Sequence, residues 1–205
     1  AGQMEALPTV APSARFMDPA TAGKFLGVAA APINWAEQYD PEQYFGALIA
    51  GAERSRFNIG DTAEWALRAA PMYAAQGVDP AQMLGIGSVL SQQAANPEQL
   101  GTYMLALQEK IDQWARQEAI PKEERGDFLG LFERFRASDE YRAVVEGESS
   151  DKRFTRALTG FEAGLDQARE NIRAVSVAIK DDTLFRRKTE ERPRELSLFQ
   201  QREIA

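Results

Sequence analysis

The sequence predicts an all-α protein, and three observations lead to this fold class. Helix-start motifs of one kind recur along the chain. Apolar residues repeat at helical spacing through most of it. The alternating runs of Val, Ile and Thr that usually indicate β-strands are missing. We therefore expect helical hairpins or a helical bundle, followed by one long helix.

The helix starts share an N-cap side chain, proline at the first helical position and glutamine at the third. DPEQ at 40–43, DPAQ at 79–82 and NPEQ at 96–99 follow this pattern. Asp or Asn can accept the unpaired N–H groups of the first turn, where proline has no N–H to lose. DTAE at 61–64 is a fourth start, of the capping-box type. Together these signals predict helices near 41–56, 62–76, 80–94, 97–118, 122–137 and 139–146.

An alanine-rich stretch, RAAPMYAAQGVDPAQML at 68–84, contains a proline in its first half. Pro71 would cost about 3 kcal/mol in an unsupported helix interior, because an N–H is lost and the ring clashes with the preceding turn. We therefore expect a bend at Pro71, or two short helices that meet there. Gly77 should end this segment, and the start at 79–82 should open the next helix. The result is a helical hairpin.

The most regular apolar pattern follows residue 150. Its members are alternately four and three residues apart, which is the a/d spacing of a heptad over about three and a half repeats. The g positions carry no Glu or Lys, so another backbone can come close. Two interpretations stay open for this helix: packing into the chain's own bundle, and self-association as a coil. The residues expected to carry self-association are Phe154, Leu158, Phe161, Leu165, Ile172, Val175 and Ile179.

Composition divides the chain into three parts. Residues 1–36 hold four prolines among small residues and predict an extended arm, either a loose terminus or a segment laid along a neighbouring subunit. Residues 37–147 carry the helical bundle with its proline- and glycine-punctuated hairpin. Residues 148–205 carry the heptad helix and a charged tail.

Composition also excludes several kinds of chemistry. The chain has no Cys and no His, so disulfides, thiolate or histidine metal sites and Ser–His–Asp catalysis are ruled out. A net charge of −7 argues against a protein that mainly grips a phosphate backbone. No apolar run approaches the roughly 18 to 20 residues of a membrane-spanning helix. We expect no catalytic residues, no metal and no cofactor.

Two short motifs resemble catalytic or phosphate-binding sequences, but simpler explanations account for both. Glu148 in GES at 147–149 could serve as the general acid of a phage lytic transglycosylase, but it lies in a charged linker where its pKa should stay ordinary. We do not favour that enzyme. GIG at 85–87 lies inside a predicted helix without a preceding strand, so it does not resemble a phosphate-binding loop. Its glycines should instead let a neighbouring helix come close.

Residues 57–107 resemble the core region of phage tail tape-measure proteins. In that family, a helix that begins at Ser or Thr is rich in alanine and has a central proline. A glycine ends it, and an apolar helix then begins at an acidic residue or Ser. A Gly-Thr pair opens the final helix. The resemblance implies a structural protein that sets tail-tube length during assembly and leaves ahead of the DNA during ejection. The matching positions are Thr62, Pro71, Gly77, Asp79, Leu84, Leu90, Gly101 and Thr102.

The chain is short for that family at 205 residues, so other functions stay open. One is a small internal-virion or ejection protein, or a tail adaptor that forms a ring. Another is a cellular helical adaptor. The virion interpretations imply copies of itself and other tail or portal-proximal proteins as partners. They also imply a location in the virion, after assembly in the host cytoplasm, and the net charge does not favour contact with DNA.

Overall fold

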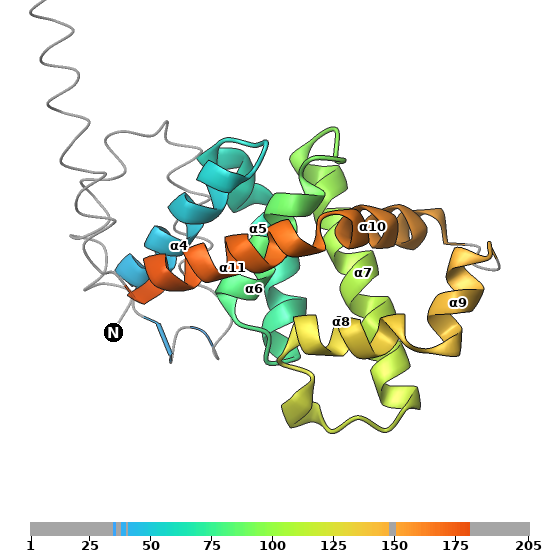
Figure 1. Cartoon of the computed structure of the whole chain (residues 1–205). Coiled ribbons are helices and arrows are strands. Elements are labelled where there is room, and N and C mark those ends of the chain that lie inside the picture. Colours follow the sequence, from blue (N-terminus) through green and yellow to red (C-terminus); the bar gives the residue numbers. More distant parts are fainter. Residues whose placement is uncertain (1–34, 36–37, 40, 148–150, 181–205) are drawn as a thin grey trace, which may run out of the picture.

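The computed structural model describes residues 35, 38–39, 41–147 and 151–180. All regular secondary structure in this part of the chain is helical, which confirms the predicted all-α class (Figure 1). The elements are α4 (Pro41–Arg54), α5 (Ile59–Ala75), α6 (Pro80–Leu90), α7 (Pro97–Gln117), the 3-10 helix η1 (Lys122–Glu124), α8 (Phe128–Arg136), α9 (Asp139–Val145), α10 (Lys152–Ala163) and α11 (Leu165–Lys180).

The helix α6 is the centre of the fold. It packs against α4, α5, α7, α10 and α11, and every residue in it except Gln82 is buried. Its sequence PAQMLGIGSVL is apolar on nearly all sides, and such a helix is stable only when it is enclosed. The surrounding helices are amphipathic and turn an apolar face inward.

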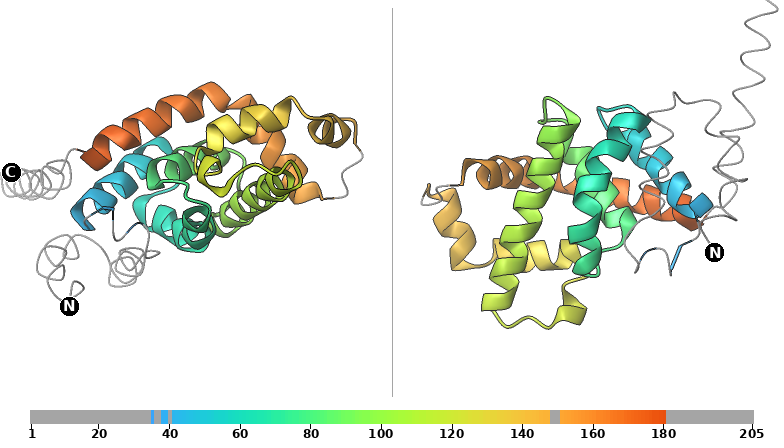
Figure 2. Two further views of the ribbon diagram at one scale, coloured as in Figure 1. Left: turned by 90° about the horizontal axis from the view of Figure 1, so that it is seen from below. Right: turned by 180° about the vertical axis from the view of Figure 1, so that it is seen from behind.

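The surrounding helices cover α6 from different sides. Helix α11 crosses α6 and lies beside α4, while α5 packs on α7 (Figures 1 and 2). Helices α8 and α9 lie at the end of the molecule away from α4 (Figure 2). There α7, α8 and α10 enclose a cluster of aromatic rings. The apolar side chains of α8 are all buried in that cluster or beside it: Phe128, Leu131, Phe132 and Phe135.

Two of the predicted N-caps are confirmed by hydrogen bonds. The Asp79 carboxylate accepts a hydrogen bond of 2.8 Å from the backbone N–H of Gln82, at the start of α6. The Asn96 side chain accepts one of 2.8 Å from the N–H of Gln99, at the start of α7. The cap expected at Asp40 lies outside the described residues.

Two predicted helix starts are wrong. Helix α5 begins three residues before the expected position, because the side chain of Asn58 accepts a hydrogen bond of 2.9 Å from the N–H of Asp61. Asp61 therefore lies in the first turn and not at the cap. The single helix expected over 122–137 is divided into η1 and α8, because Asp127 caps a new start by accepting from the N–H of Gly130 at 3.1 Å.

The long heptad helix expected from Phe154 to Ile179 is two helices, α10 and α11, separated at Gly164. The backbone of Gly164 has φ −105° and ψ 16°, which interrupts the helix at one residue. Both helices pack on α6, so the boundary expected at residue 148 does not separate two packing units. The charged tail from residue 181 lies outside the described residues.

The N-terminal arm also lies outside the described residues, except at its end. Trp35 is buried, its ring contacts that of Tyr44, and its indole N–H donates a hydrogen bond of 3.0 Å to the carbonyl of Val78. The chain just before α4 is therefore fixed to the turn between α5 and α6.

Candidate interaction surface

The residues expected to carry self-association lie inside this chain's own core. Six of the seven are buried, and Ile172 is partly buried. Their helices α10 and α11 pack on α4, α6 and α7, and the rings of Phe154 and Phe161 contact α8, so the structure uses this face for packing within one chain. Of the two interpretations left open by the heptad, the intramolecular bundle describes the arrangement seen here. Self-association through the same face stays a prediction, and it requires that this face be released.

The glycines of α6 lie where neighbouring helices come closest, as their sequence context predicted. A Cβ atom on Gly85 would lie 2.9 Å from the backbone nitrogen of Ile172 in α11. A Cβ atom on Gly87 would collide with the ring of Trp65 in α5. Since real Cβ atoms do not approach other atoms that closely, these two positions require glycine for the observed packing.

A polar contact joins α6 and α11 within the core. The side-chain amide of Asn171 donates a hydrogen bond of 2.7 Å to Oγ of Ser88, and that hydroxyl donates one of 2.7 Å to the carbonyl of Gly85. The Oδ1 atom of Asn171 accepts a hydrogen bond of 3.0 Å from Gln167. Buried polar groups with partners fix one arrangement of a core. The sequence showed Asn171 only as a g position, so this contact was missed.

The proline of the hairpin lies inside a helix, whereas its glycines lie at a helix end and at a helix contact. Pro71 lies on the exposed side of α5, which is one continuous helix, so the expected pair of short helices is not formed. The missing N–H leaves the carbonyl of Leu67 without its helical partner. Since Leu67 is also on the exposed side, water can bind that carbonyl and reduce the cost.

The two glycines of the hairpin have the roles of a helix stop and a close contact. Gly77 has φ 80°, and its N–H donates to the carbonyl of Ala74 at 2.9 Å, which ends α5 as predicted. Gly101 lies in α7 opposite α5, where an added Cβ atom would approach Cδ of Arg68 to 3.2 Å. Both glycines therefore shape the hairpin and its contact with α7.

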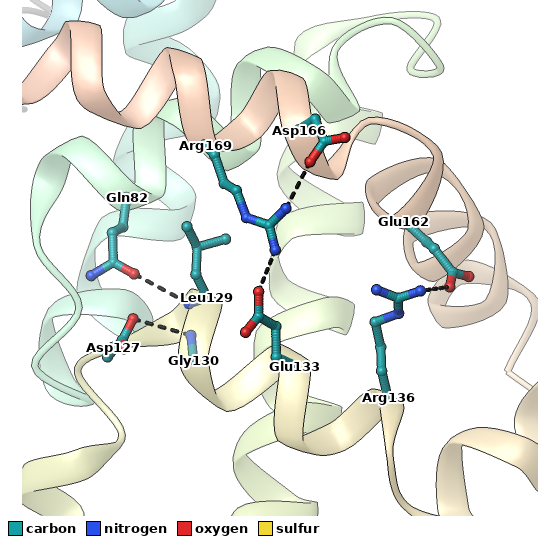
Figure 3. Close-up of polar contacts among 9 residues, drawn as sticks. All are labelled: Gln82, Asp127, Leu129, Gly130, Glu133, Arg136, Glu162, Asp166 and Arg169. Carbon is teal, nitrogen blue, oxygen red and sulfur yellow. Dashed lines mark hydrogen bonds and ion pairs between the residues drawn. The ribbon is translucent and has the colours of Figure 1, made fainter.

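Charged side chains join α8 to the region where α10 meets α11, and we call this set the polar seam (Figure 3). Arg169 of α11 forms ion pairs with Glu133 of α8 and, at 2.7 Å, with Asp166 of its own helix. The hydrogen bonds that Arg169 donates to Glu133 and to Asp166 raise the pKa of its guanidinium. Arg136 of α8 pairs with Glu162 of α10 at 3.1 Å. The polar seam therefore holds α8 against both helices.

The polar seam extends to α9 through Tyr141. Its hydroxyl donates a hydrogen bond of 2.5 Å to Oε1 of Glu162, and its ring meets that of Phe135 edge to face. Burial raises the pKa of Tyr141, and the nearby carboxylate of Glu162 raises it further. Glu162 thus accepts from both Tyr141 and Arg136, so its charge is satisfied by two partners.

The polar seam consists of paired charges that link neighbouring helices. The carboxylates of the polar seam are each paired with an arginine. Within the described residues, no group of three His, Cys, Asp or Glu side chains could hold a metal ion. Glu123 and Glu124 are exposed in η1, and Glu148 lies outside the described ranges. No helix in those ranges combines the length and apolar character needed to cross a bilayer.

Large apolar side chains on the described surface are scattered. Leu67, Val145 and Val177 are exposed, and they belong to three different helices. Single exposed apolar residues are normal and do not mark an interface by themselves.

No family model, curated protein or solved structure matches this chain. The fold and its contacts therefore define only a structural class, an all-α bundle built around one enclosed central helix.

Proposed function

We propose that this chain is a non-catalytic structural protein of a bacteriophage virion, and that it acts through surfaces presented by its helices. The observation that carries the proposal is the resemblance of residues 57–107 to the tail tape-measure core. Residues 57–107 include α5, α6 and the first part of α7, and this segment has a glycine stop at Gly77 and a capped restart at Asp79.

Among virion functions, a compact subunit is favoured over a length-setting rod. In a tube, the heptad face would have to pack on other copies along its whole length. Here that face is packed against α4, α6 and α7 of the same chain. We therefore favour a small internal or ejection protein, or a tail adaptor, that uses the hairpin unit of the tape-measure core. Its partners would be copies of itself and other tail or portal-proximal proteins.

The experiment that tests this proposal is a mass measurement combined with imaging. The purified chain should form a defined oligomer by light scattering, visible as rings or compact particles in negative stain. Long, poorly soluble coils would instead support a tape-measure function. A chain that stays a monomer at all concentrations, and that binds no tail or portal protein, would contradict the proposal.

An enzymatic alternative is tested separately. A peptidoglycan-release assay should show no activity for the wild-type chain, and the Glu148→Gln variant should behave identically. Activity that the Glu148→Gln substitution abolishes would replace the structural proposal with a lytic transglycosylase.

A further inference from the structure

We propose that two copies of this chain exchange α11, with Gly164 as the hinge, so that α10 and α11 of each copy become one straight helix. Each α11 then packs on α6 and α4 of the other copy. This inference rests on the self-association part of the proposed function, and it does not depend on the virion.

The first argument is that α10 and α11 bury the same helix face. The four-and-three apolar spacing runs unbroken in the sequence from Phe154 to Ile179, and its members on both sides of the break are buried except Ile172, which is partly buried. Two unrelated helices joined by a turn have no reason to share one heptad register. Straightening at Gly164 therefore needs no rotation of α11 about its own axis.

The second argument is that the break is confined to one residue. The N–H of Gly164 still donates to the carbonyl of Gly160 at 3.2 Å, and the N–H of Ala168 donates to the carbonyl of Gly164 at 2.8 Å. These are the hydrogen bonds of an α-helix on either side of the joint. A change of φ and ψ at Gly164 alone would continue α10 into α11 (Figure 1).

The third argument concerns what covers α6 when α11 moves. Without α11, the apolar side of α6 around Gly85 would face water, so α11 cannot simply detach. A second copy supplies an identical α11, which remakes the bond from Asn171 to Ser88 and the ion pair from Arg169 to Glu133. Exchange of an identical element keeps every contact except those at the hinge.

The contact at the hinge itself differs between the two states. A side chain on Gly164 would collide with Val89 of α6 in the bent arrangement, so the bend requires glycine there. Glycine also disfavours a straight helix relative to alanine. Gly164 therefore sets the balance between the bent single chain and the exchanged pair.

The decisive experiment uses a pair of introduced cysteines in a chain that has none of its own. In Ser88→Cys with Asn171→Cys, the two thiols replace groups that lie 2.7 Å apart. The protein is concentrated, oxidised and analysed on a denaturing gel without reductant. If two copies exchange α11, the disulfide between residues 88 and 171 joins different chains, and dimers should run as covalent dimers on this gel. If disulfides form only within single chains, the proposal is overturned. Oligomers detected by light scattering would in that case show that the copies associate in another way.

A second experiment avoids substitutions in the core. The variants Glu133→Arg and Arg169→Glu each place like charges opposite one another within one chain. In an exchanged heterodimer of the two variants, both ion pairs are restored. After joint partial unfolding and refolding, native mass spectrometry should show heterodimers enriched at least about threefold over the statistical ratio. A statistical ratio of dimers, or monomers alone, would contradict exchange.

The hinge is tested by a matched pair of glycine substitutions in one segment. Gly164→Ala should favour the dimer by at least about fivefold per chain, because Ala prefers a helix over Gly and the added methyl would collide with Val89 in the bent arrangement. Gly160→Ala makes the same change inside α10, where the added methyl meets only the side chain of Gln93. It should leave the dimer fraction unchanged. Equal effects of both substitutions would rule out Gly164 as the hinge.

Discussion

Asn171 in α11 donates a hydrogen bond to Oγ of Ser88 in α6, and the two atoms lie 2.7 Å apart inside the core. Each residue is almost completely buried, with 3% and 1% of its surface exposed. An apolar face can slide by part of a turn, but these two polar groups have partners in only one register. The contact therefore fixes where α11 lies on α6.

Removal of this contact should destabilise the fold. Asn171→Ala should lower the free energy of unfolding by about 1 to 3 kcal/mol, because Ser88 loses a partner and a small cavity forms. Urea denaturation of the single variants and of Ser88→Ala with Asn171→Ala gives the coupling between them. We expect a coupling of about 1 kcal/mol, and additive effects would show that the hydrogen bond contributes nothing.

The glycine contact between α6 and α11 predicts a contrast between two Gly→Ala variants. Gly85→Ala should destabilise the protein by about 1 to 3 kcal/mol, because the new methyl overlaps the backbone of Ile172 and α11 must move. In Gly101→Ala the tightest contact of the new methyl is 3.2 Å to Cδ of the flexible Arg68 side chain, so this variant should be neutral or stabilising by up to about 1 kcal/mol. Thermal unfolding of the two variants checks this, and equal Tm values would contradict it.

Replacement of the helix proline should stabilise the protein without changing its fold. Pro71→Ala restores an N–H to the continuous helix α5 and should add about 1 to 3 kcal/mol to the free energy of unfolding. Circular dichroism should show the same or slightly higher helix content. Unchanged assembly of this variant would mean that a bend at Pro71 is not needed for association. A less stable variant would contradict the expectation.

The buried hydroxyl of Tyr44 predicts a pH-dependent effect. It has no hydrogen-bond partner among the described residues, and burial raises its pKa. The folded state therefore keeps this proton where the unfolded chain, with a pKa of about 10, has begun to lose it. Stability should consequently fall as the pH rises above about 10.

The test compares Tyr44→Phe with Tyr73→Phe, which makes the same substitution at another buried tyrosine. Tyr44→Phe should raise stability at pH 7 by about 1 kcal/mol and reduce the alkaline fall, as followed by urea midpoints from pH 7 to 11. Burial also raises the pKa of Tyr73, but its hydroxyl donates to the carbonyl of Met104 at 3.2 Å. Tyr73→Phe should therefore lower stability at pH 7. The same result for both variants would contradict this assignment.

Features set by local chemistry were predictable from the sequence. Asp79 and Asn96 cap helices because their side chains reach N–H groups three residues on, and Gly77 ends a helix because glycine readily adopts positive φ. The glycines Gly85 and Gly87 were correctly expected at a close helix contact. The all-α class followed from such signals and from the periodicity.

Features set by tertiary contacts were not predictable. The heptad pattern continues through Gly164, and the bent arrangement leaves no room there for a side chain because of Val89 in α6, which is distant in sequence. The polar seam is likewise invisible in the sequence, because Arg169 and Glu133 are ordinary surface charges until α8 and α11 are brought together. Periodicity shows which face is apolar, but not which neighbour covers it.

The enclosure of α6 has a consequence during synthesis of the chain. A chain is made and begins to fold from its N-terminus. Helix α6 is complete at Leu90, yet the helix that closes its last side ends only at Lys180. A nascent chain must therefore carry α6 with one apolar side uncovered while residues 91–180 are made. Truncated products that end before α11 should consequently depend on chaperones for solubility.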